Sequence, residues 1–210
     1  TFRVEVDGHR IVRCYSLASA PNLDSQMKVT VKRVVDGRAS NWMNDQVSSG
    51  ATLEVMPPAG HFCLRDRDTP IVLSGAGSGI TPIMSIIKTA LETTSRLIHL
   101  LYANRNDQSI IFKDELGALL SRYSDRLEVV HRLDDVHVFV NSGLVVQHVG
   151  PRKDADFYIS APVPFIDVVL YGLSSLHIPS YRLFIFPFED RTLFLSVNIL
   201  YLCRPCSLQR

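Results

Sequence analysis

The stretch IVLSGAGSGITP, residues 71 to 82, constrains the fold of this 210-residue chain more than any other. Its first four residues form an apolar run typical of a buried strand, and glycines follow at positions 75, 77 and 79. Glycine lets the backbone turn tightly and approach a ligand closely. Thr81 is then placed to cap a helix, and Pro82 suits a first turn, where no backbone donor is needed. The stretch predicts a strand, a glycine loop and a helix in succession.

The glycine loop is also a candidate phosphate-binding site. A helix start offers free N–H groups and a positive dipole end, and both favour an anion. A tight strand-to-helix connection would use the same glycines without a ligand, but the position after the first strand of an α/β segment favours a nucleotide. The residues assigned to this site are Gly75, Gly77, Ser78, Gly79, Thr81 and Pro82.

Other chemistry-bearing motifs do not fit. A Rossmann fingerprint needs glycine where Ile80 stands, and a P-loop needs Gly-Lys-Ser/Thr at the helix start. A hydrolase nucleophile elbow needs one residue between the serine and each glycine, whereas Ser78 has glycine on both sides. The seven histidines show no metal-ligand spacing, so no metal site is expected. Cys203 and Cys206 have redox spacing, but they lie in a tail without a supporting βαβ pattern.

The periodicity of the chain changes near residue 68. Before that point, alternating apolar residues predict short antiparallel strands, at 1–6, 27–34 and 51–56. Ser40 is expected to cap a short helix over 41–47. After that point, strands alternate with helices, which predicts a parallel, doubly wound sheet. The expected strands are 71–74, 96–103, 127–133 and 156–160, and the expected helices are 82–91, 112–123 and 164–176. Residues 137–156 are ambiguous.

Composition excludes several classes of protein. Lys and Arg number 22 against 21 Asp and Glu, so the formal charge is +1. That balance provides neither a basic stripe for nucleic acid nor a polybasic run for a membrane. The apolar stretch 192–202 is shorter than the roughly 20 residues that span a bilayer. Four scattered cysteines are too few for a disulfide scaffold, so a reducing, cytoplasmic location is the expectation.

The order of four motifs resembles the ferredoxin–NADP reductase superfamily. They are Arg13-Cys14-Tyr15-Ser16, Val29-Thr30-Val31-Lys32-Arg33, Gly37-Arg38-Ala39-Ser40, and Gly75 to Pro82. The resemblance covers roughly residues 1 to 180, and this combination in this order is specific. The string LLYANRNDQSIIFKDEL is most similar to reductase components of bacterial oxygenases, of the phenylacetyl-CoA epoxidase and 3-ketosteroid 9α-hydroxylase types.

The resemblance implies a β barrel plus an α/β domain. Residues 1–68 would form an N-terminally incomplete antiparallel FAD-binding barrel. Residues 69–186 would form a doubly wound parallel-sheet NAD(P)-binding domain, and residues 187–210 an atypical tail. The boundary would lie in the charged segment RDRDTP, residues 65–70.

The resemblance also assigns two cofactors. Tyr15 would lie against the isoalloxazine of FAD and Ser16 near its N5, which makes these two the catalytic positions. Arg13 and Ser40 would bind the FAD pyrophosphate. Val31, Lys32, Arg33 and Ala39 would line the same cofactor. NADPH or NADH would bind across the glycine loop, with Asn104, Arg105, Ser160 and Pro162 completing the site.

Two classes of function follow. The favoured one is a flavin-dependent reductase that passes electrons from NAD(P)H through FAD to an iron–sulfur acceptor serving an oxygenase, with no nucleic-acid or membrane partner. The alternative is a truncated, catalytically weak or inactive nucleotide-binding remnant. It rests on three departures from the family pattern: no strands and Pro-Gly-Gln-Phe/Tyr turn before Thr1, Ser160-Ala161-Pro162 for Cys-Gly-Pro, and Phe186 for a glutamate. A pure interaction module has no supporting feature in the sequence.

Overall fold

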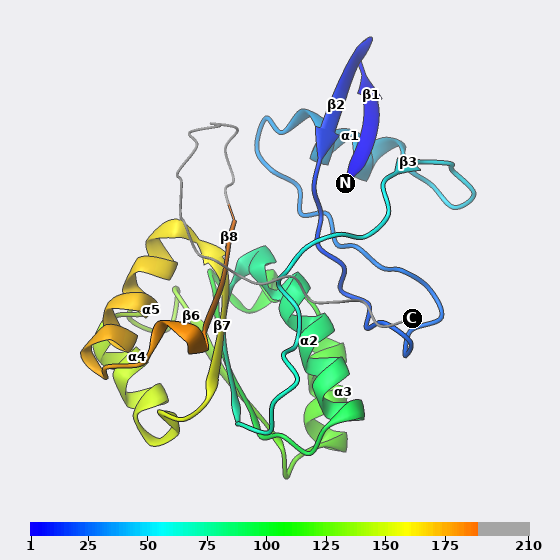
Figure 1. The fold of residues 1–210 in the computed structure, drawn as a ribbon. Helices are drawn as coiled ribbons and strands as arrows, with labels where there is room; N and C mark the ends of the chain where they lie inside the picture. The colour runs from blue at the N-terminus through cyan, green and yellow to red at the C-terminus, as the bar shows by residue number, and fades with distance from the viewer. Residues whose placement is uncertain (189–210) are drawn as a thin grey trace.

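A computed structural model describes residues 1–188 and shows two sheets connected by an extended linker (Figure 1). The predicted tail, with Cys203, Cys206 and the stretch 192–202, falls almost wholly outside these residues. The smaller sheet contains the N-terminus, and the larger sheet is the part that follows the linker.

The smaller sheet is antiparallel and has the strand order β2-β1-β3. Strands β1 (Phe2–Val6) and β2 (His9–Arg13) form a hairpin, because Asp7 and Gly8 both have positive φ and close a two-residue turn. The short β3 (Glu54–Val55) pairs with the other edge of β1. Helix α1 (Arg38–Gln46) covers one face, where Val4, Val6, Ala39 and Met43 form a small buried core.

The alternating pattern at 27–34 predicted a strand that does not form. This segment makes one isolated antiparallel bridge, between Val29 and Leu17, and Met27 is 69% exposed. Likewise β2 ends at Arg13, so Tyr15 and Ser16 lie in the extended loop beyond the strand. A period of two shows which residues share a face, but a strand also needs a neighbour for its backbone groups.

Both predicted helix caps were wrong. Helix α1 begins at Arg38 with Gly37 as its N-cap, so Ser40 lies inside the first turn. Helix α2 (Ile80–Thr93) follows a short 3₁₀ turn, η1 (Gly77–Gly79), and has Gly79 as its N-cap. The Thr81 hydroxyl instead donates to the Ser78 carbonyl at 2.9 Å. Pro82 does lie in the first turn of α2, as predicted.

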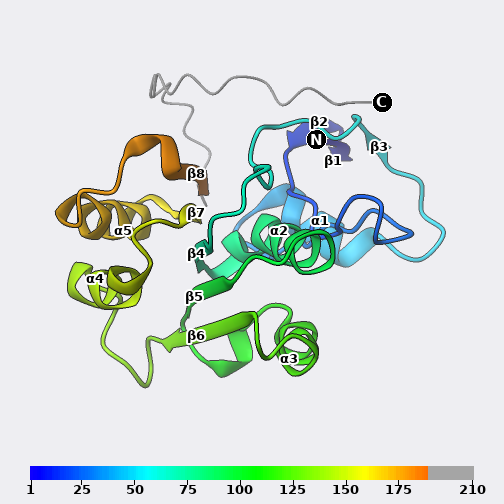
Figure 2. The ribbon, with the colours of Figure 1, turned by 60° about the horizontal axis from the view of Figure 1, so that its bottom comes forward.

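The larger sheet is parallel throughout and has the strand order β6-β5-β4-β7-β8. Its strands are β4 (Ile71–Ala76), β5 (Ile98–Asn104), β6 (Leu127–Leu133), β7 (Asp156–Pro162) and β8 (Leu183–Phe188). Helices α2 and α3 (Lys113–Arg122) pack on one face. Helices α4 (Ser142–Val149) and α5 (Val163–Ser175) pack on the other (Figures 1 and 2). The doubly wound arrangement is therefore confirmed.

Each face of this sheet has its own apolar core. Ile71, Leu73, Leu100 and Tyr102 point toward α2 and α3, whereas Val72, Phe157 and Ile159 point toward α4 and α5. Because β4 and β7 are buried on both faces, they read as nearly continuous apolar runs. The ambiguous segment 137–156 contains α4, which Asn141 caps by accepting a hydrogen bond from the Leu144 N–H at 3.0 Å.

Candidate cofactor site

The glycine loop follows the central strand at the point where the strand order reverses. Strand β4 has β5 on one side and β7 on the other. The chain adds β5 and then β6 on one side of β4, and then crosses to add β7 and β8 on the other side. In open α/β sheets, ligands bind outside the carboxyl ends of the strands at this position. The residues that end β4, β5 and β7 are therefore the first candidates for a nucleotide site.

Packing accounts for two of the three loop glycines. A Cβ on Gly79 would lie 2.0 Å from the Ser160 carbonyl oxygen, so this position must be glycine for α2 to start beside β7. A Cβ on Gly75 would lie 2.9 Å from the Ile83 side chain. Gly77 is different, because its φ is +52° and its carbonyl accepts a hydrogen bond from the Tyr102 hydroxyl at 3.1 Å. Tyr102 thus fixes the turn that shapes the loop.

The side chain of Lys32, which belongs to the part of the chain that forms the smaller sheet, lies close to this loop. Its Nζ lies 3.5 Å from the position that a Cβ on Gly77 would occupy. The side chain is exposed and has no ion-pair partner among residues 1–188. A cation beside a turn at a helix start is well placed to meet a phosphate.

Two predicted nicotinamide-site residues have buried polar atoms without a partner. Both amide atoms of Asn104, and the Ser160 hydroxyl oxygen, make no hydrogen bond of normal geometry with any residue in the described part of the chain. Asn104 is 5% exposed and Ser160 is fully buried. Leaving such a group unsatisfied costs about 1–3 kcal/mol. A ligand rich in donors and acceptors would satisfy these atoms, so this end of the sheet fits a nicotinamide dinucleotide.

Tyr102 stands beside these atoms on β5. Burial raises its pKa to about 12, and the Ile111 N–H and the neighbouring Asn104 amide oppose that rise only in part. The hydroxyl therefore stays protonated and remains a donor to Gly77. Its ring centroid lies 5.8 Å from that of His131, which is directly opposite it on β6.

The end of β5 continues into a charged surface. Arg105 is exposed and has no ion-pair partner within residues 1–188. The loop after β6 runs beside it, because the Asp134 N–H donates to the Asn104 carbonyl at 2.9 Å and the Asp135 N–H to the Arg105 carbonyl at 3.1 Å. Both aspartates are exposed. One exposed arginine and two exposed aspartates therefore lie beside the end of β5.

On the flavin side, Arg13 and Tyr15 lie close together. Burial raises the pKa of the Tyr15 hydroxyl, and the nearby Arg13 charge partly offsets this rise. Among residues 1–188, the Arg13 guanidinium donates to the carbonyl of its neighbour Val12 at 2.8 Å and to no other group, so it keeps donors for an anion. The Tyr15 ring makes an edge contact with Phe2, with centroids 5.7 Å apart, and packs at the margin of the small core.

Other predicted FAD residues are engaged elsewhere. The Arg33 guanidinium forms a two-pronged ion pair with Asp45 on α1, at 2.7 and 3.2 Å. The Ser40 hydroxyl accepts from the Val34 N–H and donates to the Gly37 carbonyl, both at 3.2 Å, so it holds the turn before α1. Ala39 is buried against β1, and Val31 packs on the same core. For these residues the structure shows a structural role.

Two surface hollows within residues 1–188 lie away from the glycine loop. One of about 440 Å³ lies along α1, beside Arg33 and Asp45. The other, of about 830 Å³, is lined by the linker and the end of α2, at the opposite edge of the large sheet. Within residues 1–188, no three His, Cys, Asp or Glu side chains are grouped to hold a metal ion. No helix in that range is long and apolar enough to span a membrane.

Sequence reasoning missed Tyr102 and the two aspartates, and it did not predict that Lys32 approaches Gly77. A usable signal for Tyr102 was present, since a tyrosine in a fully buried strand needs a partner for its hydroxyl. Asp134 and Asp135 follow a strand directly, which places them at the carboxyl edge of the sheet. The approach of Lys32 to Gly77 has no local signal, because it depends on how the two parts of the chain pack.

The fold and this site fit a pair of cofactor-binding domains, one for FAD and one for NAD. Residues 1–63 match the oxidoreductase FAD-binding domain, and residues 73–170 match the oxidoreductase NAD-binding domain. The chain therefore contains an oxidoreductase FAD-binding domain followed by an oxidoreductase NAD-binding domain, which is the order that the resemblance to ferredoxin–NADP reductases implies.

Curated relatives include the ferredoxin reductase component of 3-ketosteroid-9-alpha-monooxygenase. The Rhodococcus rhodochrous protein is 44% identical over 172 residues, which are 82% of this chain and 49% of the relative. The Mycobacterium tuberculosis (strain H37Rv) protein is 41% identical over 180 residues, 86% of this chain and 50% of the relative. The chain spans about half the length of these curated relatives.

Solved structures share the fold. A cytochrome P450 reductase from Amycolatopsis superposes with a TM-score of 0.77 at 22% identity, covering 90% of this chain and 60% of that one. The FAD/NAD-binding domain of nitric oxide dioxygenase from Vibrio cholerae gives 0.71 at 24% identity, covering 89% and 82%.

Proposed function

We propose that this chain is a flavin-dependent reductase that takes electrons from NADH or NADPH and delivers them through FAD to an iron–sulfur protein or domain serving an oxygenase. The observation that carries the proposal concerns Asn104 and Ser160, on either side of the glycine loop: their buried side-chain polar atoms make no hydrogen bond of normal geometry within residues 1–188. The relatives named above, which are reductase components of an oxygenase, support the direction of electron flow.

The chain's own residues would bind and align the two cofactors. Lys32 and the start of α2 would hold the dinucleotide pyrophosphate, while Asn104 and Ser160 would orient its two ends. Arg13 would hold the FAD pyrophosphate, and Tyr15 would cover the ring. FAD, when bound, supplies the acceptance of a hydride and the release of single electrons. No side-chain acid or base is needed.

The alternative of an inactive remnant rests on this chain's departures from the family pattern. Ser160 and Ala161 replace the cysteine and glycine of that pattern, and both are buried at the end of β7. Phe186 pairs with Ser160 in the sheet register, where the family pattern has a glutamate near the flavin. These changes favour slow turnover over loss of the fold.

Titration of FAD into the purified chain and two variants tests the proposal. Arg13→Ala removes a charge-assisted phosphate contact, which should cost about 1.5–3 kcal/mol, or roughly ten- to a hundredfold in affinity. Arg10→Ala is the matched control, since Arg10 lies on the same strand and is an exposed arginine paired with Glu54. Equal FAD affinities of the parent and the Arg13 variant would remove Arg13 from the site.

A further inference from the structure

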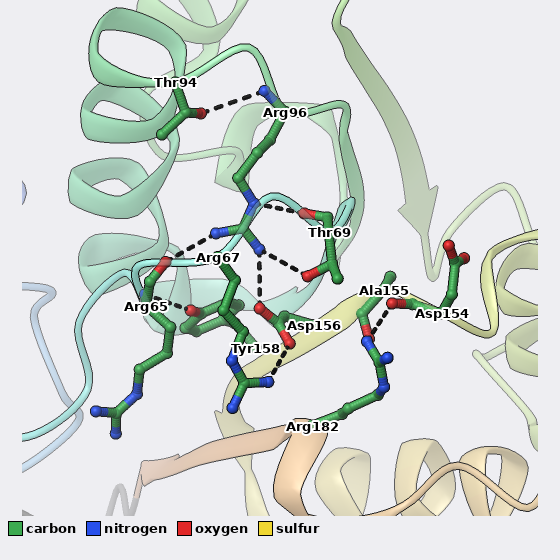
Figure 3. A network of polar contacts seen from close by, with 10 residues as sticks. All are labelled: Arg65, Arg67, Thr69, Thr94, Arg96, Asp154, Ala155, Asp156, Tyr158 and Arg182. Atoms are coloured by element: carbon green, nitrogen blue, oxygen red, sulfur yellow. Dashed lines mark hydrogen bonds and ion pairs between the residues drawn. The ribbon is translucent and has the colours of Figure 1, made fainter.

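The linker between the two sheets is held to the large sheet by buried polar groups. Figure 3 shows the side chains that reach it at the amino-terminal edge of the strands, opposite the glycine loop. The Arg65 N–H donates to the Tyr158 hydroxyl at 2.9 Å, and the Pro70 carbonyl accepts from the Asp156 N–H at 2.9 Å. Both ends of the segment 65–70 are thus bonded to β7.

Arg96 is the centre of this network. It is 3% exposed, and its guanidinium donates to the Thr69 carbonyl at 2.5 Å, to the Arg65 carbonyl at 2.9 Å and to the Asp156 carboxylate at 2.9 Å (Figure 3). The planar fork of arginine can make these contacts at once, which a lysine cannot. A single buried side chain therefore fixes two linker carbonyls to β7.

Asp156 completes the pairing from the sheet. It is fully buried, and its second oxygen accepts from Arg67 of the linker at 2.8 Å. A buried carboxylate needs partners on both oxygens. Asp156 therefore binds Arg67 of the linker with one oxygen and Arg96, just before β5, with the other. This charge arrangement is outside the cofactor site and has no part in the chemistry proposed above.

Aromatic packing supports the same segment. Phe62, which precedes the linker, makes edge contact with Tyr158 at 5.8 Å and lies 5.5 Å from Phe186. The Tyr158 ring stacks on the ring of Phe184 in β8, with centroids 4.7 Å apart. The Arg65 guanidinium lies over the Phe184 ring, 5.0 Å from its centroid. Both cations of the linker thus meet this sheet, since Arg67 also lies 5.8 Å from Phe184.

A second attachment joins the domains through helix α2. The Ser85 hydroxyl of α2 donates to the Ser19 carbonyl at 2.9 Å, and Lys88 of α2 pairs with Asp24 at 2.7 Å. Lys88 is also paired with Glu115 on α3. With the linker bound at one edge and this loop bound to α2, the smaller domain has two separate fixed points.

We infer that the Arg96–Asp156 pair is a positioning device that sets the orientation of the FAD-binding domain on the NAD-binding sheet, and thereby the approach of nicotinamide to flavin. The second part of the inference rests on the proposed function. A displacement of about 1 Å in reacting groups can lower a rate by roughly a hundredfold. Loosening the linker should therefore slow flavin reduction without weakening the binding of either cofactor.

The test compares Arg96→Lys with Arg126→Lys. The first keeps a positive charge beside Asp156 but loses the fork that binds the linker. The control loses a similar fork, whose hydrogen bonds go to the Leu91 and Thr94 carbonyls at the end of α2. Should Arg96→Lys fail to fold, Arg67→Gln removes the more exposed arm of the same network.

The first readout uses the cofactor-free protein. Amide exchange over residues 62–70, and trypsin cleavage after Arg65 and Arg67, should increase about tenfold or more in Arg96→Lys, because its effect is local opening of the linker. The control should match the parent. Unchanged exchange and cleavage in Arg96→Lys would overturn the inference.

The second readout uses protein loaded with FAD. Dissociation constants for FAD and for the nicotinamide cofactor should stay within about twofold of the parent, while the rate of flavin reduction falls roughly ten- to a hundredfold. An unchanged rate, or a parallel loss of both affinities, would overturn the positioning role. If NADH and NADPH both fail to reduce the parent, the proposed function fails, and linker exchange alone decides the structural part of the inference.

Discussion

At the scale of single residues, the candidate site is proposed from buried polar groups that lack hydrogen-bond partners within residues 1–188. Asn104 and Ser160 have buried polar atoms without partners, whereas Tyr102 has one and holds Gly77 in its turn. The sequence allowed Asn104 and Ser160 to be proposed through the family pattern, but it could not show that they are unsatisfied. Arg33 and Ser40 matched that pattern equally well, yet their contacts are internal. Motif matching does not distinguish these two cases, because hydrogen-bond partners come from the folded chain.

The acidic loop beside Arg105 predicts a preference for NADH. A 2′-phosphate would bring negative charge beside Asp134 and Asp135, which outnumber the single guanidinium of Arg105. Replacing both aspartates by asparagine should raise the efficiency with NADPH about tenfold, equivalent to ~1.4 kcal/mol, and leave NADH nearly unchanged. Rates of flavin reduction with each cofactor measure this ratio, and Arg105→Ala should move it the opposite way. A ratio unmoved by either change would place the 2′ position elsewhere.

At the scale of helices and strands, the parallel sheet was predictable and the small sheet only in part. The expected strand at 127–133 matches β6, and the expected helix at 164–176 lies within one residue of α5. These elements are specified by local runs of apolar residues, which are buried between the sheet and the helices on its two faces. The expected strand at 27–34 was wrong, since its alternation lacks a neighbouring strand over most of its length. Pairing between distant segments is not encoded locally.

The junction of β4, α2 and β7 should tolerate no side chain at Gly79. Its φ of −61° suits any residue, so the cost of Gly79→Ala is steric, from a Cβ at 2.0 Å from the Ser160 carbonyl. We expect destabilisation of about 1–3 kcal/mol. Gly117→Ala is the control, because this glycine lies within α3 with open space around it, and alanine there should add about 0.5–1 kcal/mol. Denaturant unfolding measures both, and equal stabilities would contradict the packing described.

Helix α4 should make stability depend on pH. Burial, and then the charge of Arg152, lower the pKa of His148 from 6.5 to about 4. In this interval the unfolded chain binds more protons than the folded one, so stability should fall as pH decreases from about 6.5 to about 4. His99, whose pKa burial also lowers, adds to the same trend. Unfolding midpoints across this range should fall less steeply in His148→Gln, and parallel curves would exclude His148 as a source.

At the scale of the whole molecule, the two units contact each other at two places besides the linker. Lys32 comes from the smaller unit and reaches the glycine loop of the larger one, while α2 binds the loop containing Ser19 and Asp24. The family pattern gave both units and their order, but the contacts between them depend on tertiary packing. Electron transfer requires that these contacts place two cofactors together, which neither unit can do alone.

The most direct test of this account is anaerobic reduction of FAD on the purified chain. FAD is added to the protein, unbound flavin is removed, and the visible flavin absorption band is followed after adding NADH or NADPH. The account predicts flavin bound by the chain and bleaching of its band, in a reaction that is slowed by Lys32→Ala through weaker nicotinamide-cofactor binding. A chain that binds no flavin, or whose bound flavin keeps its absorption with both cofactors, would contradict the account.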